Sequence, residues 1–499
     1  KEYYELSSAQ KRLYVIYQMD LESIAYNILL ITWLVGELDE TGFDYAFRKL
    51  TRRHENLRTS FKVIEGEAVQ TVHDEVEFEI EYYSATEDTE NTEGVAPPTY
   101  YCSRNTQMPN EKFWNENKVL QHSNTEGTRG LAPLYKEPAA STIKDFIRPF
   151  DLFQPPLLRV GLIKMEQNRH ILMVDIHHII SDGLSQGILV QEFMKLYCGE
   201  ELPPLRIQYK DYCQWLNSEK QKERLKNQES YWLKEFASEV PLLHIPVDFK
   251  TPAVQGFAGR SITFKIEPED TKALRGLLRE ERVTLSTALL AIYYVLLAKY
   301  SGQEDIIIGI ATAGRTHADL QNTAGMFVNM LPARNRPNEN KTFAAFLKEV
   351  KENLLNAYEN QDYPYEELIK KLKLQRVPGR DPLIDAVFTL QDFDDKKNHD
   401  NGLQIGSLKI LPYQYEPGNS TFPLDLEPLE EKNTIRLRLR YFAHLFKKST
   451  INTITCHFLE VLKQVLENIN IRIKNIKISY QLSSSKRDIL QEDDKDFNF

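Results

Sequence analysis

Cysteine is scarce in this sequence and is not arranged as a ligand set. The 499 residues include four cysteines, and no two of them form a CxxC pair (Cys102, Cys198, Cys213 and Cys456). This spacing argues against a structural zinc site and against a disulfide framework, so no metal is expected. Scattered thiols are typical of a reducing compartment, and the sequence therefore predicts a cytoplasmic location.

Long apolar segments and blocks of like charge are also missing. The longest apolar run, residues 288–298, has 11 residues, whereas a membrane-spanning helix needs about 20. The run therefore predicts a buried helix, and no membrane partner is expected. No run of six like charges occurs, and the net charge is −10. A nucleic-acid partner is not expected either, because such partners favour basic surfaces.

The two ends of the sequence resemble cut ends more than natural ones. Residues 1–4 do not have the pattern of a signal peptide. There is no initiator Met, and residues 491–499 are acidic and unpatterned. These features predict a piece of a longer polypeptide, which is monomeric as an excised domain.

Length and patterning predict an α/β protein with mixed sheets and more than one domain. The chain is too long for one core, and its 41% hydrophobic and 27% charged residues are typical of a globular protein. A proline-bounded stretch, residues 241–252, separates two halves. We expect one unit at 1–240, a second at 241–478, and a linker at 479–499.

Apolar periodicity places strands and helices in both halves. The predicted strands are residues 28–36, 61–63, 68–72, 76–82, 157–164, 171–176, 259–266, 305–311, 325–334, 386–390 and 435–441. The predicted helices begin at residue 7 and cover 43–53, 184–194, 209–215, 232–236, 270–280, 284–300, 343–358 and 451–466. Strands 61–63, 68–72 and 76–82 are expected to form a meander, and 157–164 to pair with 171–176 as a hairpin. Strand 305–311 is apolar enough for a central position in a sheet.

Residues 84–142 interrupt this pattern. They are rich in Asn, Thr, Glu, Pro and Gly, lack a clear period, and contain one short possible helix at 113–120. So long a structureless stretch is unusual inside a compact domain. It is interpreted as a surface insertion or, alternatively, as a lid or docking element.

The residues that carry chemistry gather in one stretch, His177-His178-Ile179-Ile180-Ser181-Asp182-Gly183. The apolar run before it predicts a buried strand, and the apolar residues after it predict a helix. Two histidines, an aspartate and a glycine thus lie at a strand-to-helix junction. Rigid elements hold such a loop, and the new helix offers unpaired N–H groups.

Each of these residues has a chemical interpretation and a structural one. Adjacent residues of an extended chain point to opposite sides, so only one of His177 and His178 faces a given cavity. A neutral histidine can accept a proton from an amine or hydroxyl near pH 7. Asp182 either supports that base, as in a catalytic triad, or pairs with an arginine and holds the loop. Gly183 lets a backbone N–H approach an oxyanion. In the purely structural interpretation both histidines pack and Asp182 caps the helix.

The stretch is similar to the HHxxxDG signature of the condensation domains of nonribosomal peptide synthetases. Further stretches resemble the other motifs of that family, in the family's order. They are residues 7–14 (SxAQxRLW, with Tyr14 in place of Trp), 53–61 (RHExLRTxF), 209–215 (YxDYAVW, with Cys213 and Gln214 as departures), 325–334 (GxFVNTLxxR, with Met330 in place of Thr), 360–366 (NQDYPFE, with Tyr365 in place of Phe) and, in part, 380–383.

The resemblance implies two chloramphenicol-acetyltransferase-like lobes in a V-shaped pseudo-dimer with a central tunnel. It implies that upstream donor and downstream acceptor peptidyl carrier proteins each present a 4'-phosphopantetheine arm at one tunnel mouth. No cofactor would be bound directly by the domain, and an adenylation domain would be adjacent. The reaction would be attack of an acceptor α-amine on a donor thioester, which forms an amide.

The same resemblance implies roles for single residues. His178 is the expected chemical residue, with His177, Asp182 and Gly183 as the rest of the catalytic set, and Asp182 is expected to form a structural salt bridge with Arg315. The residues expected near the tunnel and substrate are Ser181, Asn329, Arg58 and Tyr209. An α-amine with a pKa of roughly 7.7–8.0 is already about one tenth neutral at pH 7, at a cost of about 1.4 kcal/mol. Alignment of two tethered reactants can supply roughly 7–11 kcal/mol. Positioning by His178 is therefore favoured over strong-base catalysis.

Three relatives of this function stay open as alternatives. An epimerisation domain shares HHxxxDG but would have Trp soon after the motif, where this chain has 184–187 as Leu-Ser-Gln-Gly. A heterocyclisation domain would have Asp in place of His177. A catalytically silent carrier-recruitment module would keep the motif only as a fold element. The sequence does not identify the amino acids that are joined or the stereochemistry of the donor.

Overall fold

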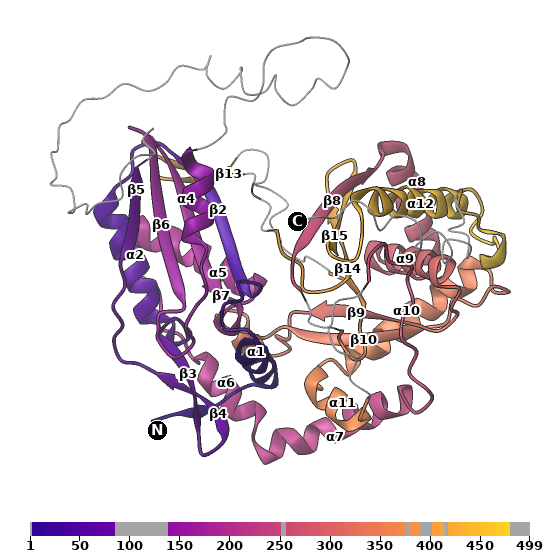
Figure 1. Ribbon diagram of the computed structural model, residues 1–499, viewed down its shortest axis with the longest axis horizontal. Coiled ribbons are helices and arrows are strands. Elements are labelled where there is room, and N and C mark those ends of the chain that lie inside the picture. Colours follow the sequence, from indigo (N-terminus) through magenta and orange to yellow (C-terminus); the bar gives the residue numbers. More distant parts are fainter. Residues whose placement is uncertain are drawn as a thin grey trace, which may run out of the picture.

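The computed structural model describes residues 2–84, 138–250, 256–374, 380–389, 402–413, 415 and 418–479. These residues form two six-stranded mixed sheets with helices, and one small three-stranded sheet (Figure 1). The strands are β1 (Tyr4–Glu5), β2 (Asn27–Val35), β3 (Thr59–Ile64), β4 (Glu67–Val72), β5 (Ile80–Ser84), β6 (Leu158–Glu166), β7 (Arg169–His177), β8 (Gly259–Ile266), β9 (Ile306–Thr312), β10 (Asn329–Asn335), β11 (Ala386–Phe388), β12 (Leu403–Ile405), β13 (Leu408–Pro412), β14 (Leu424–Glu430) and β15 (Ile435–Phe442).

Helices cover these sheets and connect them. They are α1 (Ser8–Met19), α2 (Glu40–Arg53), α4 (Pro138–Phe146), α5 (Gly183–Tyr197), α6 (Tyr209–Leu216), α7 (Glu219–Glu235), α8 (Pro268–Glu281), α9 (Leu285–Ser301), α10 (Phe343–Glu359), α11 (Tyr365–Leu372) and α12 (Lys448–Glu467), with short 3-10 turns η1 (Glu55–Arg58), η2 (His178–Ile180), η3 (Ala318–Leu320) and η4 (Ile473–Asn475). The predicted α/β class with mixed sheets is confirmed.

The first sheet has the order β12-β13-β2-β7-β6-β5 and carries the histidine motif at the end of β7. The antiparallel β6–β7 hairpin confirms the predicted pairing. β7 is buried on both faces, because Val174 and Ile176 pack into the core that includes α2 and α5, whereas Ile171 and Met173 belong to a smaller core with α4. A strand buried on both faces is apolar throughout, which is why its sequence shows no alternation.

The predicted meander is wrong in its third strand. β3 and β4 pair with each other and with β1 in the small sheet, whereas β5 joins the first sheet and runs parallel to β6. The apolar pattern that predicts a strand does not show which other strand it pairs with. The predicted stretch 84–142 also has different ends, since residue 84 closes β5 and α4 begins at Pro138. The possible helix 113–120 and Cys102 lie outside the described residues.

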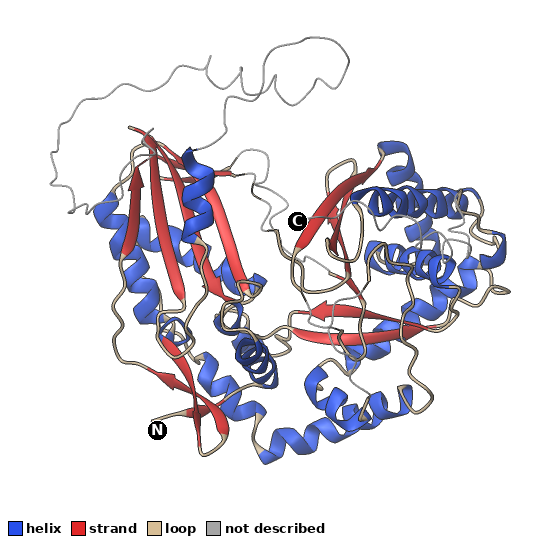
Figure 2. Ribbon diagram, viewed as in Figure 1, coloured by secondary structure: helices blue, strands red, loops and turns tan. Residues whose placement is uncertain are grey.

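The second sheet has the order β10-β9-β11-β14-β15-β8. β9 pairs with β10 on one side and β11 on the other, so its predicted interior position is confirmed. Figure 2, with the labels of Figure 1, shows α8, α9, α10 and α12 gathered on the side of the sheet that faces away from the first half, whereas α11 lies toward the first half and contacts α1. The predicted strand 325–334 starts too early. β10 begins at Asn329, because Gly325 and Phe327 bond to side chains of the first half instead of a neighbouring strand.

α9 accounts for the longest apolar run of the sequence. Its residues 287–297 are all buried in the core of the second half. No single helix in the described part of the chain is long and apolar enough to cross a membrane. α8 and α9 pass that test only as a pair, and they meet at an angle of 104°.

The two halves are joined at several places in the described part of the chain. α6 and α7 carry the chain from the first sheet to the second along the base of the V in Figure 1, and α1 packs against α11. β12 and β13 return from the second half, and β13 pairs with β2 at the edge of the first sheet. Residues 403–412 therefore depart from the expected division at 241–252, which otherwise falls in the loop between α7 and β8.

Candidate active site

The histidine motif occupies the predicted strand-to-helix junction. β7 ends at His177, η2 turns the chain, and α5 begins at Gly183. Asp182 is the N-cap of α5, since its Oδ1 accepts a hydrogen bond from the Ser185 backbone N at 2.8 Å. Five residues, 178–182, thus separate the end of the strand from the start of a capped helix, so the loop is fixed at both ends.

Asp182 forms a buried bidentate ion pair with Arg315, the residue that the sequence paired with it. The two guanidinium nitrogens lie 2.8 and 3.0 Å from the two carboxylate oxygens, and both side chains are 1% exposed. The same oxygens accept hydrogen bonds from the Ser185 hydroxyl at 2.7 Å and the Phe327 backbone N at 3.0 Å. Since both oxygens are used in these bonds, Asp182 serves the loop and the contact with the second half.

His177 is enclosed by the first half. It is 5% exposed, its Nδ1 accepts a hydrogen bond from the Ile179 backbone N at 3.1 Å, and its ring lies edge-on to Phe150. Burial lowers the pKa of His177 to about 3, with smaller contributions from His178 and Arg159. The ring is therefore neutral at physiological pH and acts as a packing group.

His178 is the histidine that keeps a free ring nitrogen. Its backbone N donates to the Tyr26 carbonyl at 2.8 Å, and its ring lies 6.5 Å from the Tyr26 ring, edge-on. Within the described residues, its buried Nδ1 has no hydrogen-bond partner. Burial lowers the pKa of His178, although nearby backbone groups of the loop and the Asp182 carboxylate raise it in part. A neutral, partly buried imidazole with an unused nitrogen can accept a proton or a hydrogen bond.

Two amides that the sequence analysis did not single out hold the histidine turn. Gln10 of α1 donates from Nε2 to the Ile179 carbonyl at 3.2 Å, and Asn56 of η1 donates from Nδ2 to the Ile180 carbonyl at 2.7 Å. Gln10 also completes the capping box of α1 with Ser7. Both amides lie in stretches that resemble family motifs. Their place in those motifs was the one feature of the sequence that could have indicated a supporting role.

The other expected site residues have structural partners. Arg58 donates to the backbone carbonyls of residues 51, 52, 73 and 74. Tyr209 is 1% exposed, and its hydroxyl bonds to Ser7 and to the Met326 carbonyl. Ser181 is fully buried. The structure thus gives Arg58, Tyr209 and Ser181 supporting contacts, and their expected place near the tunnel and substrate stays a prediction.

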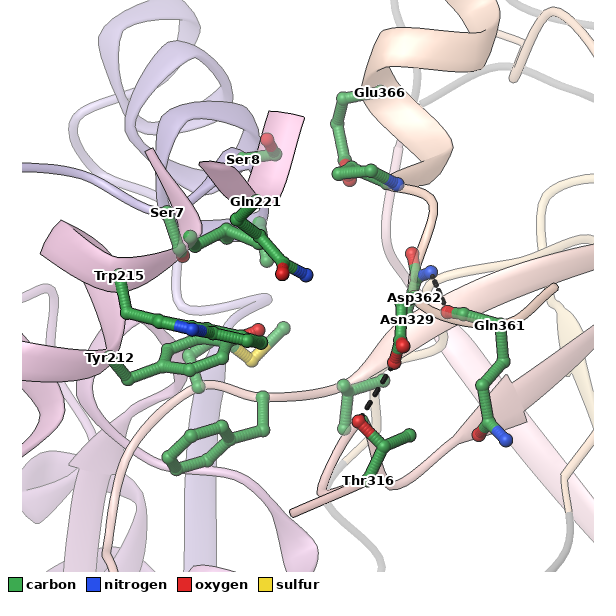
Figure 3. Close-up of a pocket in the computed structure, with 17 residues that line it drawn as sticks. Ser7, Ser8, Tyr212, Trp215, Gln221, Thr316, Asn329, Gln361, Asp362 and Glu366 are labelled. Atoms are coloured by element: carbon green, nitrogen blue, oxygen red, sulfur yellow. Dashed lines mark hydrogen bonds between the residues drawn. The ribbon is translucent and has the colours of Figure 1, made fainter. Parts of the chain in front are cut away.

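Asn329 braces the loop before α11 and lines a pocket. Its Nδ2 donates to the carbonyls of Gln361 and Tyr363, both at 2.8 Å, and its Oδ1 accepts from the Tyr365 backbone N at 3.1 Å. The pocket lies between the halves, with Ser7, Ser8, Tyr212, Trp215 and Gln221 on one side and Thr316, Asn329, Gln361, Asp362 and Glu366 on the other (Figure 3). His178 does not line it, so the pocket adjoins the motif and does not contain it.

No group of three or more His, Cys, Asp or Glu side chains in the described ranges could hold a metal ion. The free cysteines there are Cys198, Cys213 and Cys456. The groups at the junction that could take part in chemistry are therefore an imidazole, a buried ion pair and backbone N–H groups.

A family model for the condensation domain matches residues 1–101 and 118–489. The chain belongs to the condensation domain family of nonribosomal peptide synthetases. The condensation domain is 40% identical to tyrocidine synthase 3 of Brevibacillus parabrevis over 493 residues, which are 99% of this chain and 7% of that protein. It is 41% identical to bacitracin synthase 2 of Bacillus licheniformis over 468 residues, which are 94% of this chain and 16% of that protein.

Solved structures share the fold of this condensation domain. A four-domain nonribosomal peptide synthetase bound to AMP and glycine matches with a TM-score of 0.78 at 19% identity, over 97% of this chain and 34% of that one. The X-domain from teicoplanin biosynthesis matches with a TM-score of 0.77 at 20% identity, over 96% of this chain and 98% of that one. The chain spans 7% and 16% of the two synthases named above, so it corresponds to one segment of such proteins.

Proposed function

We propose that this domain forms a peptide bond between two carrier-bound substrates. An acceptor aminoacyl α-amine attacks a donor aminoacyl or peptidyl thioester, and both substrates arrive on 4'-phosphopantetheine arms of peptidyl carrier proteins. The arms belong to the substrates and not to the domain. The proposal includes an adjacent adenylation domain, a place in antibiotic biosynthesis, a cytoplasmic location and a monomeric excised domain.

The observation that carries the proposal is that Asp182, His177 and His178 have different hydrogen-bond partners at the junction. Asp182 is used by Arg315, Ser185 and Phe327, and His177 is packed with its Nδ1 bonded to the Ile179 backbone N, whereas the Nδ1 of His178 has no hydrogen-bond partner among the described residues. Because its pKa is lowered by burial, it is neutral when an amine approaches. A neutral imidazole can hold an amine N–H and turn the nitrogen lone pair toward the thioester carbon.

The step balances with the groups named. The amine nitrogen forms a bond to the thioester carbon, the C–S bond breaks, and the donor thiol leaves. The proton lost by nitrogen passes to the departing sulfur, either directly or through His178. Since a thioester is an activated acyl donor, we assign to His178 mainly the alignment of the amine, and to the N–H groups at Gly183 the approach to the developing oxyanion.

The division into lobes at 1–240 and 241–478, with a linker at 479–499, is part of the same proposal. A small sheet, a large sheet and their helices come from the first segment, and the second large sheet comes from the second. The return of residues 403–412 to the first sheet ties the lobes together. Residues 480–499 and most of 84–142 lie outside the described residues, and their roles as linker and insertion stay predictions.

An assay with two loaded carriers tests the proposed function. The domain is incubated with a donor carrier bearing an aminoacyl thioester and an acceptor carrier bearing an L-aminoacyl thioester. Mass spectrometry should find the donor acyl group added to the acceptor arm. An inverted stereocentre without an amide would instead identify an epimerisation domain, and carrier binding without chemistry would identify a recruitment module.

A further inference from the structure

Arg12 of α1 lies at the contact between the two halves. α1 packs against the histidine turn η2 and against α11, and Gln10, two residues earlier, bonds to the turn itself. The Arg12 guanidinium reaches toward the second half, with one nitrogen 3.9 Å from Glu366 Oε1 and another 4.0 Å from Asp381 Oδ2. It also lies 5.8 Å from the centre of the Tyr365 ring. Arg12 therefore faces three groups of the opposite half.

The donors of Arg12 are unusually free for a shielded arginine. Its side chain is 28% exposed, and those of Glu366 and Asp381 are 17% and 15% exposed. A guanidinium has five N–H groups, yet in the ranges that the structure describes none of them reaches an acceptor at hydrogen-bond distance. Arg315, by comparison, donates to Asp182, Ser185 and Thr323. The contacts of Arg12 with Glu366 and Asp381 are thus electrostatic contacts between the two halves, without a hydrogen bond.

The two partners of Arg12 are carboxyl groups at the start of α11 and beside it. Asp381 accepts a hydrogen bond from the Tyr365 hydroxyl at 2.5 Å, which fixes the carboxylate beside the start of α11. Burial raises the pKa of Glu366, and Arg12 opposes that change. Figure 3 shows Glu366 on α11, across the pocket from Ser7 and Ser8 at the start of α1.

Arg12 also influences His178. Burial is the main cause that lowers the pKa of His178, and the positive charge of Arg12 lowers it further. The Tyr26 ring lies edge-on to His178, and the charge of Arg12 opposes the rise that burial causes in the pKa of the Tyr26 hydroxyl. The remaining titratable neighbours of His178 are Asp182 and His177 on its own loop.

We propose that Arg12 is a positioning residue for the condensation reaction: it holds α1, and with it the histidine turn that α1 contacts, against α11 and Asp381 of the second half. This inference rests on the proposed function and adds to it a residue that joins the two halves beside the reacting atoms. Arg12 acts through His178 and through the separation of the halves. It is not assigned contact with substrate.

Two variants separate the effect of the positive charge at residue 12 from the effect of its bridge to Glu366 and Asp381. Arg12→Gln removes both, so the pKa of His178 rises. The acceptor amine causes a first fall in rate as pH is lowered, and protonation of His178 adds a second fall at lower pH; this second fall, here called the low-pH limb, moves to higher pH in Arg12→Gln. Arg12→Lys keeps the positive charge but replaces the planar guanidinium, which can contact two carboxylates, by a compact ammonium group on a shorter side chain. It should restore the position of the low-pH limb while the rate recovers only in part.

The experiment measures amide formation on loaded carriers against pH for the wild-type domain and these variants. We expect Arg12→Gln to lose about tenfold or more in rate at saturating carriers. Arg48→Gln, an exposed arginine that pairs with Asp44 within α2, is the matched control and should behave as wild type. A rate within about twofold of wild type for Arg12→Gln, together with an unmoved low-pH limb, would overturn the inference. If the wild-type domain forms no amide, the proposed function itself fails.

Two further measurements keep the inference testable if Arg12→Gln does not fold. Glu366→Gln weakens the bridge from the other side and leaves the Arg12 charge in place. It should lower the rate without moving the low-pH limb to higher pH, and a wild-type rate would contradict the bridge. NMR titration of the 11 histidines, with His178 assigned through His178→Gln, reads the effect of Arg12→Lys without turnover. A wild-type His178 titration supports the charge role, and a shift toward higher pH opposes it.

Discussion

The buried pair Asp182–Arg315 gives a stability prediction that can be worked from the structure. Asp182→Asn keeps the size of the side chain but leaves the Arg315 guanidinium, 1% exposed, without its counter-charge. Removing one partner of a buried ion pair costs about 3–5 kcal/mol. Each kcal/mol shifts Tm by roughly 2–4 °C in a domain of 150–250 residues. Asp182→Asn should therefore lower Tm by about 6–20 °C.

The assay is thermal unfolding followed by calorimetry, with two controls. Asp44→Asn breaks the exposed pair with Arg48 and should cost less than about 1 kcal/mol. The double variant Asp182→Leu/Arg315→Met removes both buried charges and should recover part of the loss. A Tm for Asp182→Asn within about 2 °C of wild type would refute the reasoning. A folded but slow variant would favour the alternative in which Asp182 supports His178 as in a triad.

Three other predictions concern the supports of the site. Gly325→Ala should destabilise the domain strongly, because an added Cβ would lie 1.9 Å from the Tyr209 ring; a wild-type Tm would contradict the packing. Asn56→Ala should cost about 1–3 kcal/mol and slow amide formation, because the buried Ile180 carbonyl loses its donor at 2.7 Å; denaturant unfolding and the carrier assay check both effects. The pKa of His177 falls from 6.5 to about 3 on burial, so the unfolded state binds more protons between these values and stability should fall as pH falls below 6.5. His177→Asn should flatten that slope in denaturant unfolding, and an unchanged slope would assign it to other groups.

The sequence predicted the local features of the site well. The strand, turn and capped helix around the motif follow from an apolar run, a polar junction and Asp182 at the N-cap. The start of α1 follows from Ser7, which caps it with Gln10 in a capping box. These features depend on neighbours in the chain, and periodicity and capping rules describe such neighbours directly.

The features that the sequence analysis missed depend on partners far along the chain. β5 has a strand pattern, but its parallel partner β6 lies beyond residues 85–137. The stretch before Asn329 resembles a strand, but Phe327 and Gly325 bond to Asp182 and Ser185 about 140 residues away. Arg58 and Tyr209 occur in motifs, and only the structure distinguishes a residue that supports the site from one that faces it. Long-range contacts of this kind leave no periodic signal.

The central claim is that His178 aligns the acceptor amine for attack on the donor thioester. The most direct test compares wild type with His178→Ala, by mass spectrometry of the acceptor carrier after incubation with a loaded donor. We predict that wild type adds the donor acyl group to the acceptor arm and that His178→Ala is slower by about 10²-fold or more, with an unchanged fold. Near-normal amide formation by His178→Ala would contradict the role assigned to this residue.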